Sequence, residues 1–219
     1  VFTLEPACLT CRYEQWIQWM FDTITKEDSL GIGYAQVGQE NNFLWENIGP
    51  GLLPQLNLVE RLAKEGLARV ETMADSGEGF CKKYRITPPM TWQASHDWNT
   101  AHNLSAQWYA SCCYRVGFLG EEGRLRVRDF FLYRDEYLSR YRRHAMTNAK
   151  STFDALPLLF PQLWAGQEDP RPFIRLLGAD GAEPEGRIRF YAESETEARA
   201  ELTDPATGAL LARFSMLPD

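Results

Sequence analysis

Three glutamates stand near the ends of short apolar runs, where acid–base chemistry could be placed. The glutamates and their runs are Glu5 after 1–4, Glu40 after 30–35, and Glu71 within 67–73. If these runs are neighbouring parallel strands, their carboxyl ends share one edge, which is where ligands bind in parallel βα proteins. Two carboxyl groups at such an edge suit glycoside cleavage, because one protonates the leaving oxygen while the other acts as base or nucleophile.

Each of these carboxylates also has a structural interpretation. Glu71 can pair with Arg69 or stay in solvent, and Asp75 beyond it is a natural N-cap for a following helix. Glu40 lies in a polar loop, 38–51, of about a dozen residues, and loops of that length are often functional. We therefore take Glu40 as the first catalytic candidate, with Glu5 and Glu71 beside it.

Several side chains are suited to holding a sugar rather than cleaving it. An aromatic ring can stack on the apolar C–H face of a sugar, and amides or carboxylates can bind its hydroxyls. The candidates are Gln39, Asn41, Trp45, Asp97 and Trp98. His96 precedes Asp97, and a carboxylate beside an imidazole can orient it. The alternative for this histidine and its neighbours is a surface loop with no role.

The cysteines and histidines do not predict a cofactor. Cys8 and Cys11 have the spacing of half a zinc site, but a structural zinc ion needs four ligands. Cys112 and Cys113 are expected in a strand, where neighbouring side chains point to opposite faces and cannot easily share an ion. No paired histidine motif, phosphate loop or dinucleotide fingerprint is present. We expect no metal and no cofactor; buried thiols are the simplest interpretation, with zinc on Cys8 and Cys11 as the alternative.

Composition places the chain among globular proteins and limits its partners. The 219 residues are 44% hydrophobic and 24% charged, which excludes disorder. A net charge of −7 argues against nonspecific binding to nucleic acid. No apolar run approaches the roughly 18–20 residues that span a bilayer, so no membrane partner is expected. Carbohydrate is compatible with these limits.

The elements that would carry the glutamates alternate between strands and helices over residues 1–90. Apolar side chains at helical spacing predict helices at about 12–26 and 53–63, and a weaker helix at 75–84. The three apolar runs separate these helices, so the order is β-α-β-α-β-α. That order implies parallel strands with crossover helices. We predict a partial parallel barrel or an open parallel sheet for this region.

Beyond residue 90 the hydrophobic period changes to two, which predicts antiparallel strands. Residues 108–118 alternate as one strand, 120–123 form a turn, and the return strand 124–128 alternates arginines with apolar residues. These arginines are expected on a solvated outer face. Further strands are expected at 187–192, 197–203 and 209–216, the last two forming a hairpin. Residues 91–219 are therefore predicted to form an antiparallel β-sandwich, which makes the fold class α+β.

Several blocks of this sequence resemble bacterial carbohydrate-active (β/α) barrels, glycoside-hydrolase-like and polysaccharide-deacetylase-like, that carry a β-sandwich after the barrel. The blocks are Leu30–Asn41, Val70–Met73, Thr87–Pro89, Asp97–Trp98 and the strand pair Gln107–Tyr133. The resemblance implies that residues 1–90 are the last βα units of a barrel. A whole barrel needs about 200–250 residues, so a missing chain portion or a second copy would cover the open sheet edge. The deacetylase branch implies an aspartate and two histidines around a metal, a set that this chain lacks.

Two functions follow from these observations. The first is the C-terminal portion of a carbohydrate-active, glycosidase-like hydrolase, with Glu40, Glu5 and Glu71 for acid–base chemistry and Trp45 as a sugar platform. The alternative is a non-catalytic carbohydrate-binding or structural interaction module. Geometry separates the two, because hydrolysis requires two carboxyl groups about 5–10 Å apart in one concave pocket.

Overall fold

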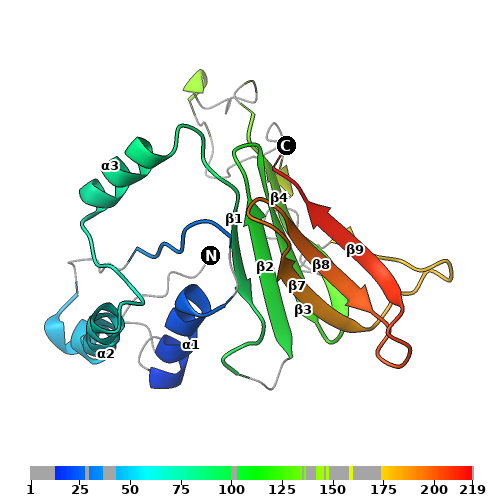
Figure 1. The fold of residues 1–219 in the computed structure, drawn as a ribbon, viewed down its shortest axis with the longest axis horizontal. Helices are drawn as coiled ribbons and strands as arrows, with labels where there is room; N and C mark the ends of the chain where they lie inside the picture. Colours follow the sequence, from blue (N-terminus) through cyan, green and yellow to red (C-terminus); the bar gives the residue numbers. More distant parts are fainter. Residues whose placement is uncertain are drawn as a thin grey trace.

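The computed structural model describes residues 13–27, 30–36, 43–99, 103–134, 136, 142–145, 147, 158–159 and 174–218. Within these residues, helices come first and two antiparallel sheets follow (Figure 1). The helices are α1 (Glu14–Thr25), α2 (Trp45–Lys64) and α3 (Met73–Lys83). The first sheet contains β1 (Met90–Ala94), β2 (Leu104–Ala110), β3 (Tyr114–Glu121), β4 (Arg124–Leu132), β5 (Leu158–Leu159) and β6 (Ile174–Arg175). The second contains β7 (Arg187–Ala192), β8 (Ala198–Thr203) and β9 (Leu210–Met216).

The predicted fold class is wrong in its parallel βα part. The runs 30–35 and 67–73, predicted as strands, form no strand, and all strand pairs of the described residues are antiparallel. Val70, in the second of these runs, is 66% exposed. The third run, 1–4, lies outside the described residues. The described chain therefore contains no partial barrel and no open parallel edge for a second copy or further chain to cover. The predicted domain boundary at residue 90 coincides with the start of β1 and stays a prediction.

The apolar stripe of the first predicted helix, by contrast, is confirmed on α1, whereas the stripe predicted for 53–63 is only partly buried on α2. Trp16, Ile17 and Phe21 on α1 pack with Leu58 and Leu62 on α2, because residues three and four apart share one helix face. These residues form a small core of their own, separate from the core between the sheets.

Helix α2 is longer at its N-terminal end than its sequence predicts. It begins at Trp45 rather than near residue 53, and it contains Pro50 and Pro54. The predicted loop 38–51 therefore ends earlier than expected, although a proline inside a helix lacks the backbone N–H that would bond to the preceding turn. The buried Gly49, Gly51, Leu58 and Leu62 indicate that tertiary packing supports the helix despite the lost donors.

The strand predicted for 108–118 is two strands joined by a tight turn. β2 and β3 pair with Tyr109 opposite Val116 and Trp108 opposite Gly117. Because the turn reverses the chain, odd-numbered residues of β2 share a face with even-numbered residues of β3. Tyr109 is therefore fully buried beside Val116, whereas one continuous strand over 108–118 would put Trp108 on the face of Val116.

The β3–β4 hairpin confirms the predicted turn and return strand. Its two-residue loop, Glu122 and Gly123, has φ angles of 51° and 76°. Two consecutive left-handed residues are typical of type I′ turns, whose twist matches that of the strands. A register shift between Gly117 and Phe118 bulges β4, so that Asp129 lies opposite Gly117.

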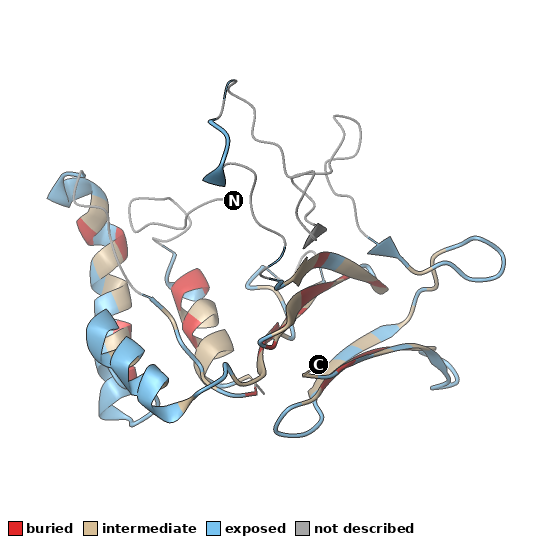
Figure 2. Cartoon of the chain, turned by 90° about the horizontal axis from the view of Figure 1, so that it is seen from above, coloured by how far each residue is buried: buried red, intermediate tan, exposed pale blue. Residues whose placement is uncertain are grey.

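The two sheets pack face to face and enclose the main core (Figures 1 and 2). Its fully buried members include Tyr109, Phe118 and Leu125 of the first sheet and Leu202 of the second. The strands predicted near 187–192, 197–203 and 209–216 are confirmed as β7, β8 and β9.

The turn between β8 and β9 is built by one aspartate. The Oδ1 atom of Asp204 accepts hydrogen bonds from the amides of Ala206 and Thr207, both at 2.8 Å. This is the side-chain turn that aspartate favours. The same amide contacts lower the pKa of Asp204 from its ordinary value.

Candidate functional site

Of the three predicted catalytic glutamates, only Glu71 lies within the described residues. Glu5 and Glu40, with Gln39 and Asn41, lie outside the described residues. Glu71 lies on the connection between α2 and α3 rather than at a strand end. The parallel-strand argument that joined these acids therefore fails, and their catalytic role stays a prediction.

Glu71 instead takes the structural role that its sequence also allowed. Its Oε1 atom lies 2.7 Å from Arg69 Nε, and its Oε2 atom accepts a hydrogen bond from Ser76 Oγ at 3.0 Å. The N-cap of α3 is Thr72 rather than the expected Asp75, because the Thr72 hydroxyl accepts from the Asp75 amide at 3.1 Å. These contacts fix the start of a surface helix.

Trp45 is exposed, but it lies along its own helix. It is the first residue of α2 and is 59% exposed. A Cβ atom at Gly49, one turn further on, would lie 3.1 Å from the indole Cε2 atom. One part of the indole therefore rests over the helix backbone, where the absence of a side chain makes room. Its predicted role as a sugar platform stays a prediction.

The predicted Trp98 forms an exposed aromatic pair with Tyr13. The ring centroids lie 6.2 Å apart and the ring planes are 19° from parallel, an offset stack. Tyr13 is 54% exposed and Trp98 is 37% exposed. We call these two rings the aromatic platform. Tyr13 immediately precedes α1, and Trp98 lies in the loop after β1, so the platform joins segments far apart in the sequence.

Hydrogen bonds hold the loop of Trp98 along α1. The indole N–H of Trp19 donates to the carbonyl of His96 at 2.8 Å. Glu27, just after the helix, accepts from both the amide and the hydroxyl of Ser95, at 3.1 and 2.6 Å. The loop thus runs antiparallel to the helix from Ser95 at its C-terminal end to Trp98 at its N-terminal end. Several contacts far apart on the helix position the platform, so its rings are not simply side chains of a free loop.

Polar residues adjoin the two rings of the platform in the sequence. Glu14 and Gln15 follow Tyr13 and are exposed, while Asp97 precedes Trp98 and is half-buried. Apolar rings whose sequence neighbours carry carboxylate and amide groups suit a ligand that has an apolar face and a hydroxylated rim. The sequence predicted Asp97 and Trp98 but missed Tyr13; the signal was an aromatic residue directly before an amphipathic helix.

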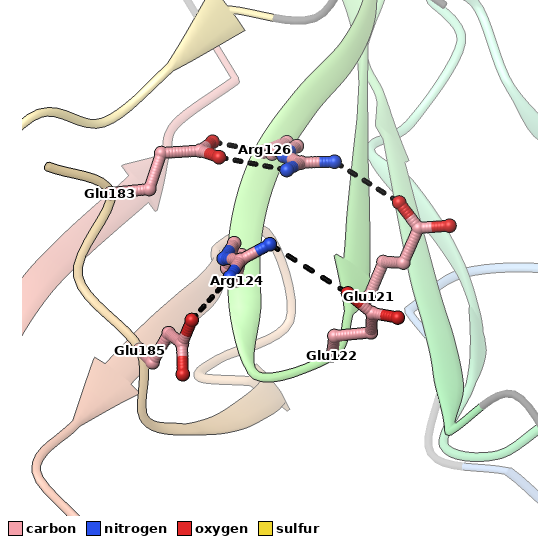
Figure 3. A network of polar contacts seen from close by, with 6 residues as sticks. All are labelled: Glu121, Glu122, Arg124, Arg126, Glu183 and Glu185. Carbon is pink, nitrogen blue, oxygen red and sulfur yellow. Dashed lines mark hydrogen bonds and ion pairs between the residues drawn. The ribbon is translucent and has the colours of Figure 1, made fainter.

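A second polar cluster joins the β3–β4 hairpin to the segment before β7. Figure 3 shows its six residues, which are Glu121, Glu122, Arg124, Arg126, Glu183 and Glu185. Arg126 donates to both carboxylate oxygens of Glu183, at 2.9 and 2.8 Å, and to Glu121 at 3.0 Å. Arg124 pairs with Glu185 and lies 3.7 Å from Glu122.

This cluster corrects the expectation that the hairpin arginines are merely solvated. The side chain of Arg126 is only 13% exposed, and that of Glu183 is 16% exposed. Their hydrogen bonds lower the pKa of Glu183 and raise the pKa of Arg126 from their ordinary values. Because every guanidinium drawn in Figure 3 is engaged by carboxylates, we interpret the cluster as a structural tie rather than an anion site.

The cysteine predictions have different outcomes. Cys8 and Cys11 lie outside the described residues, so the alternative of a zinc site there stays a prediction. The expectation that Cys112 and Cys113 point to opposite faces is wrong, because they form the β2–β3 turn and their Sγ atoms lie 3.6 Å apart. Across the part of the chain that the structure describes, no three potential metal ligands gather in one place.

Comparison of the chain with family models, curated proteins and solved structures gave no match. The resemblance to carbohydrate-active barrels therefore stays a prediction. Among the helices of the described residues, none is both long and apolar enough to cross a membrane.

Proposed function

We propose that this chain is a non-catalytic carbohydrate-binding module whose ligand stacks on the aromatic platform of Tyr13 and Trp98. The observation that carries the proposal is the exposure of two stacked rings held in place from α1. Exposed apolar area costs about 25 cal/mol per Å² in water, so covering these rings favours binding. A sugar offers both the apolar face that covers a ring and the hydroxyls that meet the flanking polar groups.

The charge of the site favours a neutral sugar. Glu14 and Asp97 are the sequence neighbours of the two rings, and the whole chain carries a net charge of −7. Carboxylates repel uronic acids and sulfated sugars but accept hydrogen bonds from neutral hydroxyls. Binding rather than cleavage is proposed because the platform rests on described geometry, whereas two of the three predicted catalytic acids lie outside it.

The test is isothermal titration calorimetry of the full chain with neutral gluco-, xylo- and chito-oligosaccharides. For a sugar that binds, Tyr13→Ala and Trp98→Ala should each weaken affinity at least tenfold, about 1.4 kcal/mol. Tyr133→Ala is the matched control, because Tyr133 is 46% exposed and follows β4 at the other end of the first sheet. Circular dichroism should show that all three variants keep the wild-type fold.

Three results would reject the proposal. The first is that none of the sugars binds, and the second is that both platform variants retain wild-type affinity. In that second case, loss of binding in Trp45→Ala would place the sugar site at the start of α2 instead. Chromatography of the same mixtures supplies the third result, because shortened oligosaccharides would mean that the chain hydrolyses its ligand.

A further inference from the structure

The turn between β2 and β3 brings two neighbouring thiols together. The amide of Ser111 donates to the carbonyl of Tyr114 at 2.9 Å, so Cys112 and Cys113 are the two residues inside the turn. The Ser111 hydroxyl accepts from the amides of Cys113 and Tyr114, at 3.1 and 3.4 Å. The resulting Sγ–Sγ distance is 3.6 Å. Neighbouring side chains of a strand diverge, so the turn itself creates this approach.

The two thiols differ in exposure in a way that suits stepwise chemistry. Cys112 is exposed, whereas Cys113 is half-buried. A reagent in solution can therefore reach Cys112, while Cys113 is placed to attack whatever forms there.

We propose that Cys112 and Cys113 are a reversible redox site that closes into a disulfide between adjacent residues, with a low-molecular-weight disulfide such as oxidised glutathione as the oxidant. The Cys112 thiolate attacks one glutathione sulfur, breaks the glutathione S–S bond and releases one glutathione thiolate. The Cys113 thiolate then attacks the Cys112 sulfur and displaces the second glutathione. The protein loses two protons and two electrons, and the oxidant is reduced to two glutathione thiols.

The adjacency of the two residues makes this disulfide easy to reverse. Consecutive Cα atoms lie about 3.8 Å apart, whereas ordinary disulfides join Cα atoms roughly 4.4–6.8 Å apart. A bond outside that range is more readily reduced, and exposed bonds of this kind belong to the labile, regulatory class. The site is therefore a switch rather than a structural staple.

The turn is connected to two other strand ends that would respond to closure. The carbonyl of Cys113 accepts from the amide of Tyr133 at 2.7 Å. The hydroxyl of Tyr114 donates to the carbonyl of Leu217 at 2.7 Å, which ties the turn to the segment after β9. By strand register, the turn lies at the end of the first sheet away from the loop of Trp98. The inference is thus independent of the carbohydrate proposal, and either can fail alone.

The experiment uses the full wild-type chain in buffers of increasing oxidised-to-reduced glutathione ratio. After acid quenching and alkylation, trypsin releases the peptide 86–115, which contains Cys112 and Cys113 and no other cysteine. The expected product is this peptide lacking two hydrogens, with neither glutathione nor alkyl groups attached. Dithiothreitol should restore two alkylated thiols.

Two controls test the stepwise order and the role of the turn. Cys113→Ser should stop at the glutathione adduct of Cys112, because the attacking thiol is gone. The chain unfolded in urea should need at least a tenfold higher ratio to close the disulfide, because it lacks the preformed turn. The proposal is overturned if the folded wild-type peptide stays doubly alkylated, retains glutathione, links to another peptide, or closes only as readily as the unfolded chain.

Discussion

Arg126 on β4 binds both carboxylate oxygens of Glu183, a residue 57 positions further along the chain. This fork-shaped contact is among the stronger hydrogen-bonded arrangements between charged side chains. It connects the β3–β4 hairpin to the segment that leads into β7, and so it helps to fix the second sheet over the first. Because little of either side chain is exposed, the contact is shielded from the solvent that weakens surface ion pairs.

Replacing Arg126 should destabilise the protein more than replacing its neighbour Arg124. Arg126→Met leaves Glu121 and Glu183 without this partner, and we expect the free energy of unfolding to fall by about 2 kcal/mol. Arg124 is 33% exposed, so Arg124→Met should cost less than about 1 kcal/mol. Urea unfolding at neutral pH measures both free energies. Equal losses of stability in the two variants would contradict the structural role assigned to Arg126.

Acid should weaken the same contact in a defined direction. Hydrogen bonding to Arg126 holds the pKa of Glu183 below its ordinary value, so the folded state favours the charged carboxylate. The contact therefore contributes its full share to the free energy of unfolding above the pKa of an unfolded glutamate. That share is lost as the pH falls through the lower pKa of Glu183 in the folded state. The melting temperature of Glu183→Gln should therefore decline less steeply below about pH 5 than that of wild type. Arg126→Met should show the same reduced slope, and unchanged slopes in both variants would argue against the assignment.

Two glycines provide a matched pair of alanine substitutions. A Cβ atom at Gly117 would lie 2.6 Å from Asp129 Oδ2 and 2.8 Å from Trp108 Nε1. Gly117→Ala should therefore cost about 1–3 kcal/mol by disturbing the bond between these two groups. Gly77 lies in α3, and beyond its chain neighbours and the backbone of its own helix nothing lies within 4 Å of its Cβ position, so Gly77→Ala should raise the free energy of unfolding by about 0.5–1 kcal/mol. Thermal unfolding measures the change in stability of both variants. A Gly117→Ala variant as stable as wild type would show that Trp108 and Asp129 can move to make room for the methyl group.

Local patterns predicted the elements of this fold better than their pairing. α1 and the strands after residue 187 follow from helical spacing and from alternation around turn residues such as Asp204. The run at 67–73 was also predicted as a strand, but it forms none, and Val70 is exposed. Short apolar runs do not specify which other segment will cover them, and this is why the parallel sheet was predicted wrongly.

The candidate site shows the same limit. Trp98 and Asp97 were chosen as sugar-binding residues from their types alone, but Tyr13 joins them only because the loop of Trp98 folds along α1. The bond between Trp19 and His96 that fixes this loop spans 77 positions, and no local pattern predicts it. The approach of Cys112 and Cys113 was missed for a related reason. Apolar residues alternate without a break over 108–118, so the sequence pattern gave no sign of the two-residue turn.

The most direct test of the central claim is to follow the indole N–H signals of the seven tryptophans by NMR during titration with a bound neutral oligosaccharide. The signal of Trp98, assigned by its disappearance in Trp98→Phe, should move in proportion to occupancy. The signal of Trp108, whose N–H is bound to Asp129, should stay in place. Movement of the Trp45 signal without that of Trp98, or saturation of binding with no change at Trp98, would contradict a carbohydrate site on the aromatic platform.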